Sequence, residues 1–234
     1  MAFLIGSFMP FIILLLLIIV HEIGHFLTAI FFKIEVDRIY IYPFGGVSKF
    51  NISLNESLLK EFLILIMGPV FQIAFYFIII NIDYFNNYIN LITVYNYTIL
   101  LFNLLPIYPL DGGKLLNIIL STKLSFRNSF DVSIIVSYLT LLLISIYLLC
   151  RNLSLNIVVI ISFLIFKISK ELKKRKYIFD KFLLERYLNR YSFKKRKKVN
   201  SINNFMRGKY HLVKKGNKYY TEKTILENKF NNRY

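Results

Sequence analysis

Five long apolar stretches alternate with short polar segments and dominate the pattern of this chain. A helix needs about 20 apolar residues to cross the core of a bilayer, and about 17 to 25 are tolerated. Four of the stretches fit, whereas the third is shorter and ends in two prolines, so we expect it to break inside the membrane. The pattern predicts an all-α polytopic membrane protein with about five transmembrane helices, at roughly 3–32, 58–82, 89–107, 131–150 and 153–169.

Composition agrees with this prediction. The chain is 56% hydrophobic and 18% charged, whereas soluble domains are about 45–50% apolar and about 25% charged. The apolar N-terminus lacks a basic flank, so we expect no removable signal peptide. Cys150 is the single cysteine, which rules out an internal disulfide and leaves histidine and carboxylate as the ligands of any metal site.

Charge is distributed unevenly along the chain. Residues 1–166 hold 8 Lys/Arg and 8 Asp/Glu, whereas residues 167–234 hold 22 and 5. We therefore divide the chain into a membrane domain over 1–170 and a basic cytosolic tail over 171–234, which is expected to contact anionic lipid. Basic residues also favour the segments 33–57 and 108–130 over the segments on the opposite side, so we expect these two segments to face the cytosol.

A short segment after the first apolar stretch shows alternation, aromatic residues and a glycine pair. It runs from Ile39 to Val47 and contains Pro43, Phe44, Gly45 and Gly46. These features predict a short, membrane-associated β-hairpin.

The sequence His21-Glu22-Ile23-Gly24-His25 is an H-E-x-x-H motif, expected on a helix. Residues at positions i and i+4 share a helical face, so both imidazoles can bind one zinc ion per chain while Glu22 acts as general base. Gly24 would let another backbone approach closely. The alternative is a pair of structural histidines near the interface. Placing a charged group at the bilayer centre costs about 2.5–3.5 kcal/mol, which favours the functional interpretation.

A catalytic zinc site usually has three protein ligands, and Asp111 is the better candidate for the third. It follows Pro106 and Pro109 and precedes Gly112 and Gly113, which allow a tight turn. Asp111 could instead cap the next helix. His211 lies in the basic tail and is a poor candidate.

Further polar residues interrupt the apolar stretches. Asn103 could polarise a scissile carbonyl, or it could hydrogen-bond to a neighbouring helix. The dipeptide Gly68-Pro69 and Gln72, in the second stretch, suggest close packing and a kink, with a modest chance of contact with the site.

Together these motifs resemble the site-2 protease family of intramembrane zinc metalloproteases (M50-type), and within it the stage IV sporulation protein FB branch. The resemblance spans roughly residues 11–191. It is carried by His21–His25, Pro43–Gly46, Gly68-Pro69, the run from Asn103 to Lys114, and Phe182-Leu183-Leu184-Glu185-Arg186-Tyr187.

The resemblance implies zinc held by His21, His25 and Asp111, Glu22 as the catalytic acid/base, and Asn103 in support. It also implies cleavage of a membrane-associated pro-sigma factor near the cytosolic face, in the mother-cell membrane around the forespore, under control of inhibitory regulatory membrane proteins. Members of this branch usually carry one more N-terminal span and a longer nucleotide-sensing CBS domain. The tail is therefore expected to be a truncated CBS-like remnant.

Two other function classes are compatible with the sequence. One is a non-catalytic membrane metal-binding or regulatory protein of the same fold, which the presence of Glu22 disfavours because a binding site needs no base. The other is a membrane anchor whose tail binds nucleic acid or lipid. Nucleic acid is disfavoured because no recognition motif accompanies the charge.

Overall fold

The computed structural model describes residues 8–34, 36–42, 45–50, 52–149, 155–189, 191–193 and 195–231. The chain divides into two compact units. The first comprises Met1–Ile52 and Leu59–Leu105, and the second comprises Ser53–Leu58 and Pro106–Tyr234. The positions of the two units relative to one another are not determined.

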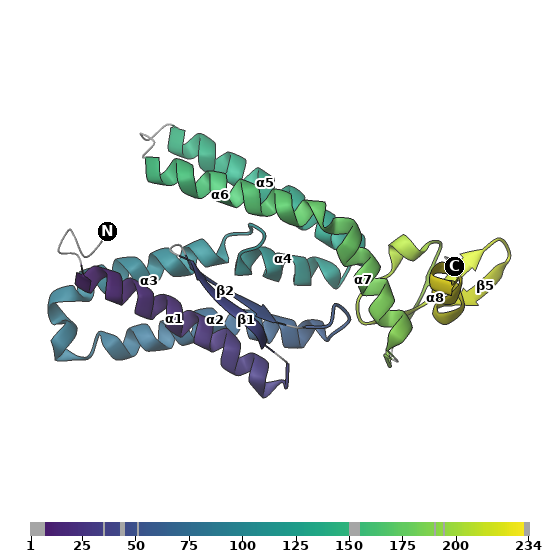
Figure 1. The fold of residues 1–234 in the computed structure, drawn as a ribbon, viewed down its shortest axis with the longest axis horizontal. Helices are drawn as coiled ribbons and strands as arrows, with labels where there is room; N and C mark the ends of the chain where they lie inside the picture. Colours follow the sequence, from purple (N-terminus) through teal and green to yellow (C-terminus); the bar gives the residue numbers. More distant parts are fainter. Residues whose placement is uncertain are drawn as a thin grey trace. The chain divides into compact units, whose positions relative to one another are not determined.

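Three helices and a hairpin make up the first unit (Figure 1). The helices are α1 (Phe8–Phe31), α2 (Leu58–Ile79) and α3 (Ile89–Leu104), and a 3-10 turn, η2 (Asp83–Tyr88), precedes α3. An apolar core joins them, formed by Ile13, Leu17, Ile18, Ile79, Ile92 and Ile99. As predicted, the third apolar stretch is short, and α3 ends two residues before Pro106.

The expected hairpin is confirmed as an antiparallel pair. Strand β1 (Val36–Tyr42) pairs with β2 (Gly45–Phe50), so that Tyr42 lies opposite Gly45 and Ile41 opposite Gly46. Both strands contact α1. Pro43 and Phe44, which belong to the predicted hairpin segment, lie outside the described residues.

The second unit begins with a short helix packed on a long one. Helix α4 (Asp111–Ser121) lies against α5 (Phe126–Leu149), which in turn contacts α6 (Leu155–Lys173). Serine hydroxyls fill the α4–α5 contact: Ser121 donates to Ser129 at 2.9 Å, and the Ser133 hydroxyl lies 3.2 Å from the Asn117 amide. Small polar side chains let the two helices approach closely and satisfy their hydrogen bonds internally.

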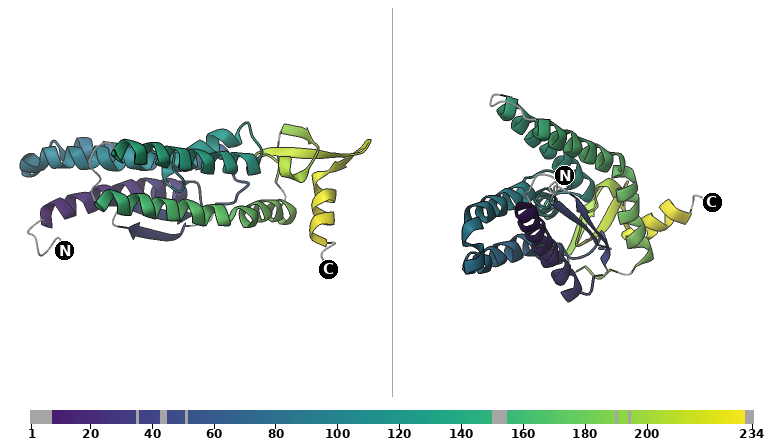
Figure 2. Two further views of the ribbon diagram at one scale, coloured as in Figure 1. Left: turned by 90° about the horizontal axis from the view of Figure 1, so that it is seen from above. Right: turned by 60° about the vertical axis from the view of Figure 1, so that its left-hand side comes forward.

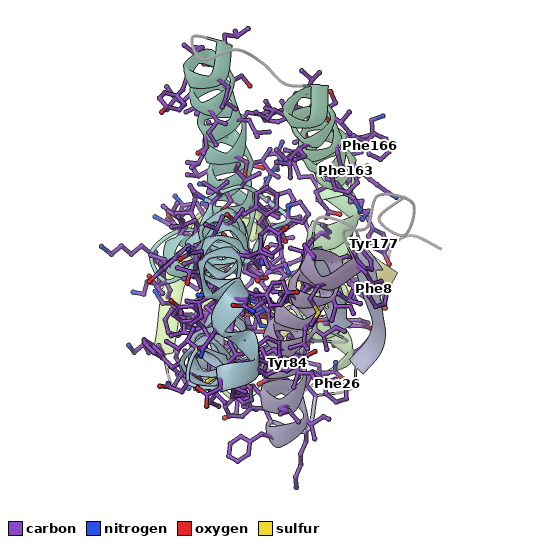
Figure 3. The ribbon with its side chains drawn as sticks, turned by 90° about the vertical axis from the view of Figure 1, so that its left-hand side faces the viewer. Phe8, Phe26, Tyr84, Phe163, Phe166 and Tyr177 are labelled. Atoms are coloured by element: carbon purple, nitrogen blue, oxygen red, sulfur yellow. The ribbon has the colours of Figure 1, made fainter. Side chains whose placement is uncertain are left out.

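Among the described residues, three helices are long and apolar enough to cross a bilayer: α1, α2 and α5. Helix α3 has only 16 residues, and the last turns of α6 carry Lys167, Lys170 and Glu171. The predicted count of five spans therefore stays a prediction. Large apolar side chains cover the outside of these helices, and Figure 3 labels Phe8, Phe166 and other exposed aromatic residues. Such a surface suits a bilayer rather than water, and the chain is an integral membrane protein.

Beyond α7 (Arg175–Leu188) the tail forms a mixed α/β structure, which corrects the all-α prediction for this region. Strand β3 (Lys195–Val199) runs parallel to β4 (Lys209–Lys215), and β4 pairs antiparallel with β5 (Lys218–Thr221). The 3-10 turn η3 (Ile202–Asn204) lies in the β3–β4 connection, and α8 (Glu222–Asn231) closes the tail (Figure 2). The core contains Phe182, Leu183, Phe205, Val213 and Ile225.

A buried Arg186 organises this tail. Its guanidinium pairs with Glu222 at 2.8 Å and donates to the backbone oxygens of Met206 and Lys209. Its Nε donates to the Asn55 side chain at 2.5 Å, which anchors the segment before α2 within the same unit. Burial lowers the pKa of Arg186, although Glu222 opposes that shift.

His211 is engaged in the same network. Its Nε2 accepts from the Met206 amide at 3.0 Å, and its Nδ1 lies 3.2 Å from Glu222. Burial lowers the pKa of His211. Burial would raise the pKa of Glu222, but the hydrogen bond from His211 and the charge of Arg186 outweigh it, so the pKa lies below its ordinary value.

Candidate active site

The H-E-x-x-H motif lies in the middle of α1 and faces the interior of the first unit. His21, Glu22 and His25 are 1%, 6% and 3% exposed. Their candidate ligand atoms all lie within 4.8 Å of one another, in the one group of this kind found among the described residues. One helical turn separates the two histidines, and their Nε2 atoms are 3.1 Å apart. This proximity meets the first requirement for sharing one metal ion.

Hydrogen bonds to the other nitrogen of each ring identify its tautomer. His25 Nδ1 lies 2.8 Å from the backbone oxygen of Ile64, which can only accept, so Nδ1 carries the proton. His21 Nδ1 lies 2.8 Å from Gln72 Oε1. The Gln72 amide nitrogen donates to both oxygens of Asn96, at 2.9 and 3.0 Å, which fixes the amide orientation and makes His21 Nδ1 a donor as well.

An imidazole that carries its proton on Nδ1 presents a lone pair at Nε2. At 3.1 Å two such lone pairs repel each other unless a proton or a cation lies close to both. Metal-ligating histidines commonly donate their second nitrogen to a carbonyl or carboxylate in this way. The donor set therefore fits a zinc ion, held by Nε2 of His21 and of His25.

Two glycines allow the close approach of α1 and α2 at this point. A Cβ on Gly24 would lie 2.4 Å from the Met67 backbone oxygen, and a Cβ on Gly68 would lie 2.3 Å from His25 Nε2. Neither position has room for a side chain. The expectations that Gly24 allows close backbone contact and that Gly68 lies in a tight contact are confirmed. Gln72, which was given only a modest chance of reaching the site, contacts His21 directly.

Two other predicted site residues, Asn103 and Asp111, belong to different units of the chain. Asn103 is 9% exposed in the last turn of α3, within the first unit. Asp111 is 8% exposed and begins α4 in the second unit, where its Oδ1 lies 3.3 Å from Lys114 Nζ. Leu110 occupies the N-cap position of α4, and its apolar side chain forms no capping hydrogen bond. Asp111 as the third zinc ligand stays a prediction.

The turn before Asp111 is tightly packed. A Cβ on Gly113 would lie 2.5 Å from backbone atoms of Ile107 and Tyr108, and the Tyr108 amide donates to Ser137 of α5 at 2.8 Å. The expected tight turn at Gly112 and Gly113 is not found, because both glycines lie in the first turn of α4; Gly113 instead allows the Ile107–Tyr108 backbone to pack closely against that turn. Gly45 and Gly46 begin β2.

Sequence reasoning missed Asn96 and the Ile64 carbonyl. Asn96 is 1% exposed and orients Gln72, which orients His21. The sequence did contain a signal that could have identified Asn96. Gln72 and Asn96 are both amide side chains within apolar stretches, where polar groups need hydrogen-bond partners. The contribution of Ile64 comes from its backbone, which the sequence cannot reveal.

Comparison with known proteins identifies the family of this chain. The family model for peptidase family M50 matches residues 9–87 and 80–146, more than half of the chain. The chain belongs to peptidase family M50. It is 35% identical over 187 residues to stage IV sporulation protein FB of Bacillus subtilis, covering 78% of this chain and 65% of that protein.

Two further likenesses come from Methanocaldococcus jannaschii. A zinc metalloprotease of that organism is 32% identical over 158 residues, covering 64% of the M50 chain and 45% of the relative. The solved structure of its site-2 protease has a TM-score of 0.55 and 25% identity, covering 68% of the M50 chain and 76% of that structure. The M50 chain thus spans less than two thirds of the length of both curated relatives.

Proposed function

We propose that this chain is an intramembrane zinc metalloprotease that cleaves a membrane-associated protein near the cytosolic face. The observation that carries the proposal is the orientation of the histidine pair. Gln72 Oε1 and the Ile64 carbonyl each accept a proton from a ring, which leaves both Nε2 atoms facing a common point. A pair of structural histidines has no need for this arrangement.

One zinc ion per chain would be held by His21, His25 and Asp111. When bound, zinc acts as a Lewis acid that polarises a carbonyl oxygen and makes water more acidic. Asp111 completes the three protein ligands that catalytic zinc sites use. Support for Asp111 comes from its burial at the beginning of α4 and from the tightly packed turn before it.

Glu22 would act as the general base and then as the general acid. It is buried beside both histidines, so it can take a proton from the attacking water and deliver that proton to the leaving amine. Asn103 would donate a hydrogen bond to the scissile carbonyl oxygen as negative charge develops there. Its burial in the last turn of α3, in the same unit as Glu22, supports this role.

The β1–β2 hairpin would hold the substrate. A helical peptide bond is shielded and its carbonyl is already hydrogen-bonded, so the substrate must unwind locally before cleavage. A two-stranded sheet has an outer edge on each strand, where an extended segment can add. Replacing residues 43–46 should reduce cleavage more than zinc content, and equal loss of both would contradict this role.

The substrate that we propose is a pro-sigma factor, processed in the mother-cell membrane during sporulation and restrained by inhibitory membrane proteins. Similarity to stage IV sporulation protein FB supports this assignment. The basic tail would face the cytosol, in agreement with the positive-inside distribution.

The experiment that tests the proposal is cleavage of a co-expressed pro-sigma factor by the natural chain and by Glu22→Gln. We expect processing only by the natural chain, at equal protein and zinc levels. His21→Ala serves as a control that should lose zinc as well as activity. Processing by both the natural chain and Glu22→Gln would remove Glu22 from the mechanism. Zinc bound by the natural chain without cleavage of any tested membrane substrate would favour the non-catalytic metal-binding alternative.

A further inference from the structure

A small surface cavity beside the beginning of α5 is lined by basic, amide and hydroxyl side chains. Its volume is about 290 Å³, and all of it belongs to the second unit. Its walls are the α4–α5 connection, the first turn of α5, β3 and the β3–β4 connection. The lining residues are Lys123, Leu124, Ser125, Asn128, Lys197, Lys198, Val199, Asn200, Asn204 and Met206.

The two walls are fixed to each other by backbone and aromatic contacts. The Phe126 amide, at the beginning of α5, donates to the Phe205 backbone oxygen at 2.8 Å. The Phe126 ring also stacks on Phe182, with the ring centroids 4.1 Å apart. Phe205 and Met206 are almost completely buried. The cavity is therefore a preformed part of the fold.

Lys197 and Lys198, two of the three lysines of the cavity, have weak neutral partners in the described parts of the chain. Lys197 Nζ lies 3.1 Å from the Met206 sulfur, and Lys198 Nζ lies 5.0 Å from the centre of the Tyr219 ring. A thioether is a weak acceptor. No ion pair within the described residues joins an acidic side chain to these two lysines or to Lys123. Three like charges around one small cavity repel each other, and a bound anion would relieve that repulsion.

The acidic residues of 106–234, the larger part of the second unit, supply no counter-charge to the cavity. Residues 106–234 contain seven Asp and Glu residues. Each of these seven acidic residues pairs with a basic side chain that is not part of the cavity. The seven are Asp111, Asp131, Glu171, Asp180, Glu185, Glu222 and Glu227. An anion from another molecule would supply the negative charge that the acidic residues of 106–234 do not place beside these lysines.

We infer that this cavity binds the phosphate group of an anionic phospholipid. Lys123 and Ser125 directly precede α5, a helix long and apolar enough to cross the bilayer, so the cavity lies where such a span meets the headgroups. Lysine ammonium groups and amide nitrogens donate hydrogen bonds to phosphate oxygens. The positive end of the α5 helix dipole adds to the attraction. A lipid is favoured over a soluble phosphate because the fold places the cavity at the end of a membrane helix.

The test measures binding of short-chain phosphatidylglycerol and short-chain phosphatidylcholine to the full chain in a neutral detergent. The cavity variant combines Lys123→Gln, Lys197→Gln and Lys198→Gln. Its matched control combines three lysines of β4 and β5 outside the cavity, namely Lys214→Gln, Lys215→Gln and Lys218→Gln. Both variants remove the same charge from the same unit, and thermal unfolding should verify that both are folded.

We expect the cavity variant to bind phosphatidylglycerol about 10-fold or more weakly than the natural chain, and the control to lose about 2-fold or less. Phosphatidylcholine binding should change little in either variant. Equal losses in the two variants would mean a diffuse basic surface and would overturn the site.

Two further measurements sharpen the test. Asn200→Asp, which places a carboxylate in the cavity, should also weaken phosphatidylglycerol binding while leaving all lysines in place. Inorganic phosphate, compared with chloride at equal ionic strength, should compete poorly with the lipid. Efficient displacement by inorganic phosphate would assign the cavity to a soluble phosphate and overturn the lipid assignment.

Discussion

Gln72 should control zinc affinity although it is not a ligand. Its side chain accepts from His21 Nδ1 at 2.8 Å and is itself held by both oxygens of Asn96. In Gln72→Leu, the His21 ring loses the partner that fixes its tautomer and orientation. Removing such a supporting residue typically weakens metal affinity about 10–100-fold, which corresponds to about 1.4–2.8 kcal/mol.

The same substitution should also destabilise the first unit. Gln72 is completely buried, and leucine would leave the Asn96 side-chain oxygen without the amide that now donates to it. A buried polar group left unsatisfied costs about 1–3 kcal/mol. Zinc affinity should therefore be measured by competition with a chromophoric chelator at a temperature where the variant remains folded, and compared with its unfolding midpoint in the absence of metal.

Tyr76→Phe is the matched control for Gln72→Leu. Tyr76 lies one turn further along α2, and its hydroxyl pairs with Thr93 of α3 at 3.1 Å. This variant removes an α2–α3 hydrogen bond that does not involve either histidine, so zinc affinity should change less than about 2-fold. Unchanged zinc affinity in a folded Gln72→Leu, or an equal loss in Tyr76→Phe, would refute the orienting role.

Three further predictions concern packing and the tail. Gly68→Ala should abolish zinc binding in a chain that still inserts into the membrane, because its Cβ would lie 2.3 Å from His25 Nε2; zinc analysis of the purified chain checks this. Arg186→Ala should destabilise the tail by about 3–5 kcal/mol, because it leaves Glu222 buried without its cation, and limited proteolysis should detect the loss. Tail stability should fall as pH drops below 6.5 and further below 4.5, the ordinary pKa values of His211 and Glu222. Both pKa values are lowered in the folded state, so unfolding takes up protons; a tail stability that rises with acidification would contradict this.

Features that depend on local sequence could be predicted from the chain alone. The apolar stretches predict α1, α2 and α5 because a membrane helix satisfies its own backbone and shows its composition directly. The hairpin observed at 36–50 was predicted over Ile39–Val47, because alternation and glycines are local signals. The H-E-x-x-H motif placed both histidines on one helical face for the same reason.

The sheet of the tail could not be predicted, because its strands lack the usual signals. Strand β3 reads Lys-Arg-Lys-Lys-Val, and only Val199 is buried. Its parallel partner β4 begins ten residues after β3 ends, so the pairing is not a local hairpin. The charged run was interpreted as part of a basic cytosolic tail that contacts anionic lipid, and no strand was predicted there, although its backbone is hydrogen-bonded into a sheet and its lysines line a cavity.

The Arg186 network gives a physical account of a motif that carried the resemblance. Within Phe182–Tyr187, the Phe182 ring packs in the tail core, and Glu185 Oε2 accepts from the Leu54 amide at 2.8 Å. Arg186 then binds Asn55 on one side and Glu222 on the other. The chain continues directly from Asn55 into α2, the helix that carries Gln72 and Gly68. Removing the Arg186 side chain would therefore take away one of the contacts that hold this segment, whereas the Glu185–Leu54 hydrogen bond would remain. Arg186→Ala should therefore reduce turnover while zinc remains bound, whereas Gly68→Ala should lose both.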